Sequence, residues 1–266
     1  MDILIDEPDP GIVRVTLNRP DQRNAITAAM GAQLLALWTE LAVRPDMRAL
    51  ILTGTGDLAF SAGGDLKERH RQSAAELARS QAVHRLAGTV RQTFAFPVIA
   101  AVNGAALGGG AELVLSADLV LMADHATVGL PEIRHGFMPG MGGTQALMRR
   151  VGKLAAAELL LTGAAVVADR ALALGLVNRV LPAAELPEAA LALARQIATA
   201  PEVAVQAIIR ALRFGDEGGL TGGLALEAAL HRHLMDRPER QAGVAGFALR
   251  GAGPATTGEP RAHPSD

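Results

Sequence analysis

Three consecutive glycines, Gly108–Gly110, precede an acid, Glu112, inside an apolar stretch that runs from Ala100 to Asp124. A glycine-rich turn at the start of a helix leaves the first backbone N–H groups unpaired, and the helix dipole favours negative charge there. The turn is therefore either tight packing or a site for an anionic ligand group. Because the neighbours of Glu112 are apolar, we expect partial burial of its carboxylate, which is costly and is often accepted for catalysis.

A second glycine turn, FSAGGD, places Ala62 at the point that corresponds to Gly109. Two turns that each direct one N–H at a shared point form an oxyanion hole, which stabilises an enolate-like or tetrahedral oxyanion. A second acid, Glu132, follows Pro131 in VGLPEIRHGFMPGMGGTQ. Each glutamate alone is also ordinary in a first helical turn. Two of them beside glycine turns can divide acid and base roles around one substrate.

Other catalytic motifs are absent from the sequence. The lack of cysteine excludes disulfides, thiolate catalysis and Cys-based metal sites. NGAALGGG does not match the dinucleotide fingerprint, and the sequence has no P-loop, no G-x-S-x-G and no H-E-x-x-H, so we predict no metal. His135, three residues after Glu132, is a candidate for substrate contact. The histidines expected to be surface or structural residues are His70, His84, His231 and His233.

Composition limits the class of protein. The 266 residues, 50% apolar and 20% charged, suffice for one large domain or for one domain with a small appendage. A net charge of −2, with six Phe, one Trp and no Tyr, argues against nucleic-acid binding. The first ten residues carry four acids and no basic segment, unlike a signal peptide. Residues 92–111 are uncharged, but Pro97, Asn103 and Gly104 argue against a membrane helix. We expect a cytoplasmic protein.

Alternating strands and helices must position these residues. Apolar residues with a period of two, or in short β-branched runs, predict strands, and apolar residues at helical spacing predict helices. Asp65 and Glu68 match an N-cap and its acidic third position. Such alternation favours parallel strands joined by helical crossovers, and after about Leu154 the pattern is mostly helical. The predicted elements are strands at Gly11–Pro20, Arg48–Gly54, Pro97–Val102 and Ala117–Asp124, with helices at Ile26–Ala42 and from about Gly110.

Five segments in this order resemble motifs of the crotonase family, the enoyl-CoA hydratases and isomerases. They are LNRPDQRNAI, AFSAGGDLKE, PVIAAVNGAALGGGAELVLSADLVLMA, GLPEIRHGFMPGMGGTQALMRRVG and LTGAAVVADRALALGLVNRV. The resemblance implies an α/β fold with a spiral of repeated ββα units over residues 1–195. It also implies a C-terminal helical region, residues 196–250, that builds a trimer or a dimer of trimers. Residues 251–266 have lost all periodicity, so we expect a flexible tail there.

The resemblance also implies roles for individual residues. The N–H groups of Ala62 and Gly109 would bind the thioester oxygen, and Glu112 and Glu132 match the two catalytic glutamates of hydratases. The acyl pocket would include His135, which stands where the family usually has an aliphatic residue, and Gly140. The C-terminal segment RGAGPATTGEP departs from the basic, aromatic ending of the family. The residues that would contact CoA are Arg23, Ala25, Ile26, Ala62, Gly64, Asp65, Leu66 and Phe247.

The resemblance implies a hydratase that adds water across C2=C3 of a 2-enoyl-CoA and needs no cofactor beyond the CoA of its substrate. Glu112 would activate the water, and Glu132 would deliver a proton to C2. The alternatives are an enoyl-CoA isomerase, another acyl-CoA lyase, decarboxylase or hydrolase of the same family, and a non-catalytic acyl-CoA-binding protein. The presence of both glutamates favours the hydratase.

Overall fold

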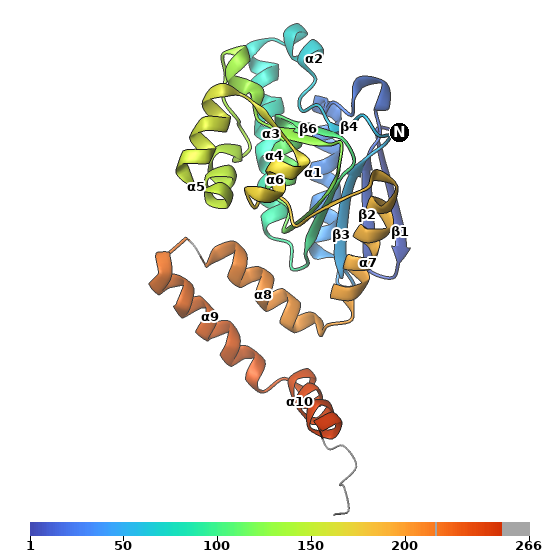
Figure 1. Ribbon diagram of the computed structural model, residues 1–266, viewed down its shortest axis with the longest axis vertical. Helices are drawn as coiled ribbons and strands as arrows, with labels where there is room; N and C mark the ends of the chain where they lie inside the picture. The colour runs from blue at the N-terminus through green and yellow to red at the C-terminus, as the bar shows by residue number, and fades with distance from the viewer. Residues whose placement is uncertain (216, 252–266) are drawn as a thin grey trace, which may run out of the picture. The chain divides into compact units, whose positions relative to one another are not determined.

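The chain divides into two compact units (Figure 1). The computed structural model describes residues 1–215 and 217–251. The first unit comprises Met1–Arg213, which the structure describes throughout, and the second begins at Phe214. Two sheets, one of six strands and one of four, form the framework of the first unit.

The larger sheet has the strand order β1-β2-β3-β5-β7-β10. β1 is antiparallel to β2, and every other neighbouring pair is parallel. The central strands read ALILTG, VIAAV and LVLMA, the near-continuous apolar runs that parallel strands need when both faces are covered. The strands are β1 (Ile3–Asp9), β2 (Ile12–Leu17), β3 (Ala49–Gly54), β5 (Val98–Val102), β7 (Leu119–Ala123) and β10 (Arg179–Leu181).

The smaller sheet has the order β4-β6-β8-β9, and each of its strands is three residues long. Each of β4, β6 and β8 follows a strand of the larger sheet after a short turn, so every repeat gives one strand to each sheet and then continues into a helix. This arrangement confirms the predicted α/β spiral of ββα units. The strands are β4 (Ala59–Ser61), β6 (Ala105–Leu107), β8 (Thr127–Gly129) and β9 (Ala165–Val167).

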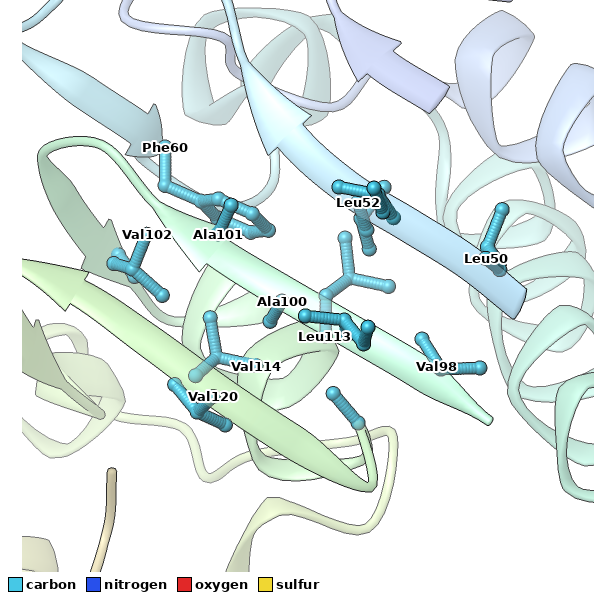
Figure 2. Close-up of a cluster of buried hydrophobic side chains, with 14 of the residues drawn as sticks. Leu50, Leu52, Phe60, Val98, Ala100, Ala101, Val102, Leu113, Val114 and Val120 are labelled. Carbon is cyan, nitrogen blue, oxygen red and sulfur yellow. The ribbon is translucent and has the colours of Figure 1, made fainter. Parts of the chain in front are cut away.

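Helices cover these sheets. α1 packs against α3, α4 packs against β4, β5 and β6, and α7 packs across β3, β5 and β7. Figure 2 shows the resulting core, in which Leu113 and Val114 of α4 lie beside side chains of β3, β5 and β7. The α-helices of the first unit are α1 (Ala28–Val43), α2 (Leu66–Arg71), α3 (Ala74–Gln92), α4 (Gly109–Leu115), α5 (Gly143–Thr162), α6 (Ala168–Ala173), α7 (Leu186–Ala198) and α8 (Glu202–Phe214). Three short 3-10 helices are η1 (Pro20–Gln22), η2 (Pro131–His135) and η3 (Ala183–Glu185).

Capping residues fix where α2 begins. The Asp65 carboxylate accepts the N–H groups of Lys67 and Glu68, as the sequence predicts for an N-cap. The Glu68 carboxylate does not return to Asp65, because it accepts the N–H of Ala28 at 2.9 Å. This acid therefore ties α2 to the first residue of α1.

The division of the chain falls at Arg213, later than the residue-195 boundary that the sequence analysis gives. The reason is α8, whose Arg213 guanidinium donates to Asp118 and to the carbonyl oxygens of Phe94 and Phe96. These hydrogen bonds hold the end of α8 to the first unit.

The second unit contains α9 (Gly219–Met235) and α10 (Pro238–Gly251), and α9 buries no residue. Apart from Gly251, the tail predicted at residues 251–266 lies outside the described residues. No helix in the described ranges is long and apolar enough to cross a membrane.

Candidate active site

The predicted CoA-contacting loop, residues 23–26, is held against the first glycine turn by backbone hydrogen bonds. The Ile26 N–H donates to the Gly63 carbonyl at 2.7 Å, and the Asp65 N–H donates to the Ile26 carbonyl at 3.0 Å. Asn24 adopts a φ of 54°, a left-handed conformation that Asn tolerates better than most residues. The structure therefore brings two segments of predicted CoA contacts into one surface, although they lie far apart in the sequence.

Two buried polar side chains fix this junction. Asn24 donates to the carbonyl oxygens of Thr55 and Ala59 at 3.0 and 2.7 Å, and the Ser61 hydroxyl donates to the Asn24 carbonyl at 2.8 Å. Neither residue was singled out by the sequence analysis. The signal in the sequence was weak: Ser61 lies between Phe60 and Ala62, but Asn24 follows the polar residues Gln22 and Arg23. Buried polar groups of this kind are retained when they are fully hydrogen-bonded.

The two glycine turns place the N–H groups of Gly64 and Gly109 beside each other. A Cβ added to Gly109 would lie 3.7 Å from the Gly64 nitrogen, so the two backbones approach closely. Both residues line the same cavity. Within the described part of the chain, neither N–H donates a hydrogen bond. Two free donors at one end of a cavity can bind a developing oxyanion.

The Ala62 N–H, predicted as the first oxyanion donor, is engaged elsewhere. It donates to the Arg23 carbonyl at 2.9 Å, so this N–H is not available to a ligand. The free donor in this turn is Gly64, which the sequence analysis assigned only to CoA contact. The correction has a physical reason: the hydrogen bonds of the folded loop decide which of several consecutive N–H groups remains free, and spacing does not reveal them.

Glu112 lies in the first turn of α4 with 5% of its surface exposed. Its Oε1 accepts the N–H groups of Met141 and Gly143 at 2.7 and 2.9 Å. Gly142, between them, has a φ of 96°, a conformation that favours glycine. Burial raises the pKa of Glu112, while the two N–H donors act in the opposite direction. The carboxylate is thus buried and already oriented by the loop after η2.

Glu132 lies in η2 and is similarly buried, with 6% exposed. Its Oε2 has no hydrogen-bond partner in the described residues. A Cβ added to Gly108 would lie 3.3 Å from Oε1, which places this carboxyl group at the N-terminus of α4. Burial raises the pKa of Glu132. Glu132 therefore has a buried carboxyl group whose Oε2 can still form a hydrogen bond with a ligand.

The two acids differ in what surrounds them. Hydrogen bonds from two N–H groups favour the ionised form of Glu112, whereas the unpartnered Oε2 of Glu132 favours a protonated carboxyl group. Two titratable groups in different environments can take separate base and acid roles. The arrangement can therefore accept a proton at one side of a bound substrate and donate one at the other.

A cavity between α1, α3 and α4 is lined by Glu112 and by the two glycines with free N–H groups, Gly64 and Gly109, whereas Glu132 does not line it. Its polar lining includes the side chains of Arg69, His84 and Arg91 in addition to Glu112. His84, expected to be a surface or structural residue, is buried and lines this cavity. The full lining is Ile26, Gly31, Leu34, Trp38, Gly64, Arg69, His84, Ala87, Gly88, Arg91, Gly109, Glu112, Leu113, Ser116 and Met141.

The spacing of residues on α3 was a signal that the sequence analysis did not use. His84, Ala87, Gly88 and Arg91 follow one another at helical intervals and all line the cavity. A face that contains both a histidine and an arginine does not have the apolar pattern of a core helix. This face of α3 could be recognised as the lining of a cavity only once the structure showed which helices it faces.

Of the predicted site residues, only Ile26, Gly64, Gly109 and Glu112 line the cavity. His135 is exposed and stacks on Phe137, and Gly140 is exposed with no atom within 4 Å of an added Cβ. Phe247 belongs to the second unit, where 75% of it is exposed. The residue of the 137–141 segment that does line the cavity is Met141.

Comparisons with known proteins agree on one family. Residues 7–253 match the family model described as enoyl-CoA hydratase/isomerase. The chain is 40% identical over 250 residues to 2,3-dehydroadipyl-CoA hydratase of Escherichia coli, which covers 93% of this chain and 96% of that protein. It is 38% identical over 214 residues to mevalonyl-coenzyme A hydratase of Aspergillus fumigatus, covering 80% and 79% of the two chains. A crystal structure of enoyl-CoA hydratase from Bacillus anthracis superposes with a TM-score of 0.91 at 35% identity, covering 94% and 97%.

Proposed function

Because the chain belongs to the enoyl-CoA hydratase/isomerase family, we propose that it is a hydratase that adds water across C2=C3 of a 2-enoyl-CoA thioester. The observation that carries this proposal is the presence of two buried carboxyl groups, Glu112 and Glu132, beside the free N–H groups of Gly64 and Gly109. Moving a proton between C4 and C2 needs only one acid. The three similar proteins named above as hydratases support the same reaction.

The oxyanion donors act on the thioester. When water adds to C3, the electrons of the double bond move into the thioester carbonyl and form an enolate. The N–H groups of Gly64 and Gly109 would hydrogen-bond this oxygen more strongly as its charge develops, which lowers the barrier to the addition. Because both donors belong to the backbone of tight turns, little reorganisation is needed at the moment of reaction.

The glutamates handle the protons. Glu112, held by two backbone donors, accepts one proton from the water as its oxygen bonds to C3. Glu132 gives its proton to C2 of the enolate. The product is a 3-hydroxyacyl-CoA, and a proton exchange between the two carboxyl groups through solvent restores the starting state.

The test is the hydration of crotonyl-CoA, followed as loss of the enoyl absorbance. The wild-type protein should turn over this substrate, whereas Glu112→Gln and Glu132→Gln should each lose nearly all activity while still binding CoA. Near-normal rates in both variants would refute the proposal. A second incubation, with a 3-enoyl-CoA, separates isomerisation: accumulation of the 2-enoyl product without hydration would identify an isomerase.

The proposal has three further parts, of which the first two follow from the same family membership. The protein needs no cofactor beyond the CoA of its substrate, which would contact the joined loops at residues 23–26 and 62–66. It assembles as a homotrimer or a dimer of trimers through its C-terminal helices, and the large exposed apolar side chains of the second unit support this: Leu220, Leu224, Val244 and Phe247. The proposed cytoplasmic location rests on the composition of the sequence and not on the family. Light scattering during size-exclusion chromatography measures the assembly.

A further inference from the structure

The far end of the cavity is formed by side chains of three helices. Trp38 of α1, Arg91 of α3 and Ser116 at the end of α4 line it. Along α4 the lining runs from Gly109 to Ser116, a rise of about 10 Å at 1.5 Å per residue. A chain bound by its thioester at Gly109 can therefore reach Arg91 with its other end.

Arg91 is buried without an anionic partner. Only 4% of it is exposed, its Nη1 donates to the Leu113 carbonyl at 3.3 Å, and its Nε has no partner in the described residues. Burying a guanidinium in this way is costly, and burial lowers its pKa to about 10. Such a group is retained at this cost when a ligand completes its hydrogen bonds.

The surrounding charges do not neutralise Arg91. Asp118 is the acid whose charge acts on Arg91. Its carboxylate already accepts two hydrogen bonds from Arg213 and a third from the N–H of Val98. Arg150, also close enough to oppose the charge of Arg91, donates to the carbonyl oxygens of Ala117 and Leu176. Three arginines thus share one aspartate, and this region lacks negative charge.

Two more polar groups extend this lining toward the thioester. The Nε2 of His84 is buried with no hydrogen-bond partner in the described residues. The Arg69 guanidinium lies where an added Cβ on Gly64 would be, and it makes no hydrogen bond or ion pair within the described ranges. The cavity beyond Glu112 therefore combines apolar walls, such as Leu34 and Trp38, with cationic side chains that are suited to an anionic group.

We propose that the acyl group of the substrate carries a carboxylate at its far end, and that Arg91 binds this carboxylate. The inference rests on the proposed function, since it takes the thioester to lie at Gly64 and Gly109. The free Nε of Arg91, together with its second terminal nitrogen, presents the fork of donors that pairs with a carboxylate in a bidentate manner. The bound carboxylate supplies the negative charge that the three arginines lack.

The first experiment uses the wild-type protein and pairs of 2-enoyl-CoAs with equal carbon numbers, one ending in a methyl group and the other in a carboxylate. Chains on the order of six to ten carbons match the length of the lining. We expect the kcat/KM for the carboxylate-ended substrate to exceed that for its partner by about 10- to 100-fold, the range for hydrogen bonds to a charged group. Equal values, or a preference for the methyl-ended chain, would overturn the proposal.

The second experiment compares variants on the same substrate pairs. Arg91→Met should remove the preference by slowing the carboxylate-ended substrate while the methyl-ended one is hydrated as fast or faster. Arg91→Lys, which keeps the charge, should retain part of the preference. Arg85→Met, on the exposed side of the same helix, is the matched control and should change neither substrate. Equal slowing of both substrates by Arg91→Met would indicate a structural role and contradict the assignment.

Arg69→Met distinguishes the two unpaired arginines of the cavity. If this variant, and not Arg91→Met, abolishes the preference, the assignment to Arg91 is wrong. Binding of saturated acyl-CoA pairs, measured by calorimetry, separates this inference from the reaction itself. Tighter binding of the carboxylate-ended analogue with no hydration of any 2-enoyl-CoA would remove the proposed function and keep the carboxylate site.

Discussion

The two ends of the cavity are built in different ways. At the thioester end the working groups are backbone N–H groups of Gly64 and Gly109 and a carboxylate held by two more N–H groups. At the far end they are long side chains, above all Arg91, that project from helices. Substitution of one residue cannot remove a backbone N–H, except by proline, but it replaces a side chain entirely. The oxyanion donors are thus fixed by the fold, whereas the two glutamates and the side chains that recognise the acyl group are open to substitution.

Burial favours the uncharged form of the titratable groups at both ends of the cavity, so it shifts the pKa values of acids and bases in opposite directions. It raises the pKa of Glu112 and Glu132, and it lowers the pKa of His84 and Arg91. In each case the neutral form is favoured because the charged form loses its hydration. Burial thus destabilises the charged forms of the acids and of the bases alike. Binding of a charged substrate should therefore shift the protonation equilibria of the groups at either end.

The largest expected effect is a loss of catalysis at the thioester end. Glu132→Gln should lower kcat/KM for crotonyl-CoA by about 1,000-fold, within the usual range for a positioned acid. Stability should move the other way: a carboxyl group with a raised pKa stabilises the fold less as pH rises from its ordinary value, so the neutral amide should match or exceed wild type at pH 7. Urea unfolding measures this.

The control for that experiment is Glu158→Gln, since Glu158 is exposed on α5. It should leave both activity and unfolding unchanged. A large drop in the stability of Glu132→Gln would show that the carboxyl group supports the fold, and the loss of activity could then not be read as a proton-transfer effect.

The next largest effect is a loss of stability when the charges near Arg91 are no longer balanced. Asp118→Asn should lower the free energy of unfolding by about 3 kcal/mol, because it leaves Arg213 and its neighbouring arginines without the carboxylate they share. Asp6→Asn removes the partner of Arg14 in an exposed pair and should cost less than 1 kcal/mol. Similar losses for the two variants in urea titrations would contradict the buried-charge account.

A smaller effect comes from the loop that orients Glu112. In Gly143→Ala the added Cβ would lie 2.9 Å from the Cγ and 3.0 Å from the Oε1 of Glu112, so the carboxylate must move. We expect about a tenfold loss of kcat, equivalent to about 1.4 kcal/mol. Gly140→Ala, in the same segment but with open space around its Cβ, should keep a rate near that of wild type. Equal losses would attribute the effect to the loop as a whole.

The smallest effect is a displacement of the pH profile. Because Glu112 must be ionised, kcat/KM should fall as pH drops through its raised pKa, and because Glu132 must be protonated, it should fall again as pH rises through its own. Both limbs should therefore lie above 4.5, the ordinary value for a glutamate. The apparent values belong to the coupled pair. A limb at or below 4.5 in stopped-flow measurements would contradict the burial of that acid.

Much of the framework could be predicted from the sequence because its causes are local. The apolar runs of β3, β5 and β7 and the capping by Asp65 depend on residues close together in the chain. The burial of Glu112 followed from its apolar neighbours on α4. Strands of three residues, such as β4, carry too short a pattern to be found by periodicity.

The details of the site could not be predicted, because they depend on contacts between distant segments. The Ala62 N–H is occupied by Arg23, 39 positions earlier, which leaves Gly64 as the free donor. The N–H groups that hold Glu112 come from residues 29 and 31 positions later. Nothing in the sequence near Arg91 shows that its side chain is buried and donates to the Leu113 carbonyl, 22 positions later. Hydrogen-bond partners of this kind are set by tertiary structure.

The pair between Asp118 and Arg213 has a consequence for the order in which the protein is made. The two residues are 95 positions apart. During synthesis β5, α4 and β7 therefore leave the ribosome well before Arg213, whose guanidinium donates to the residues beside them. Until α8 emerges, the carbonyl oxygens of Phe94 and Phe96 lack that donor and Asp118 lacks its strongest counter-ion. The first unit can therefore complete its interior only in the last stage of its synthesis, and a nascent chain that pauses before Arg213 still presents an unfinished core to chaperones and proteases.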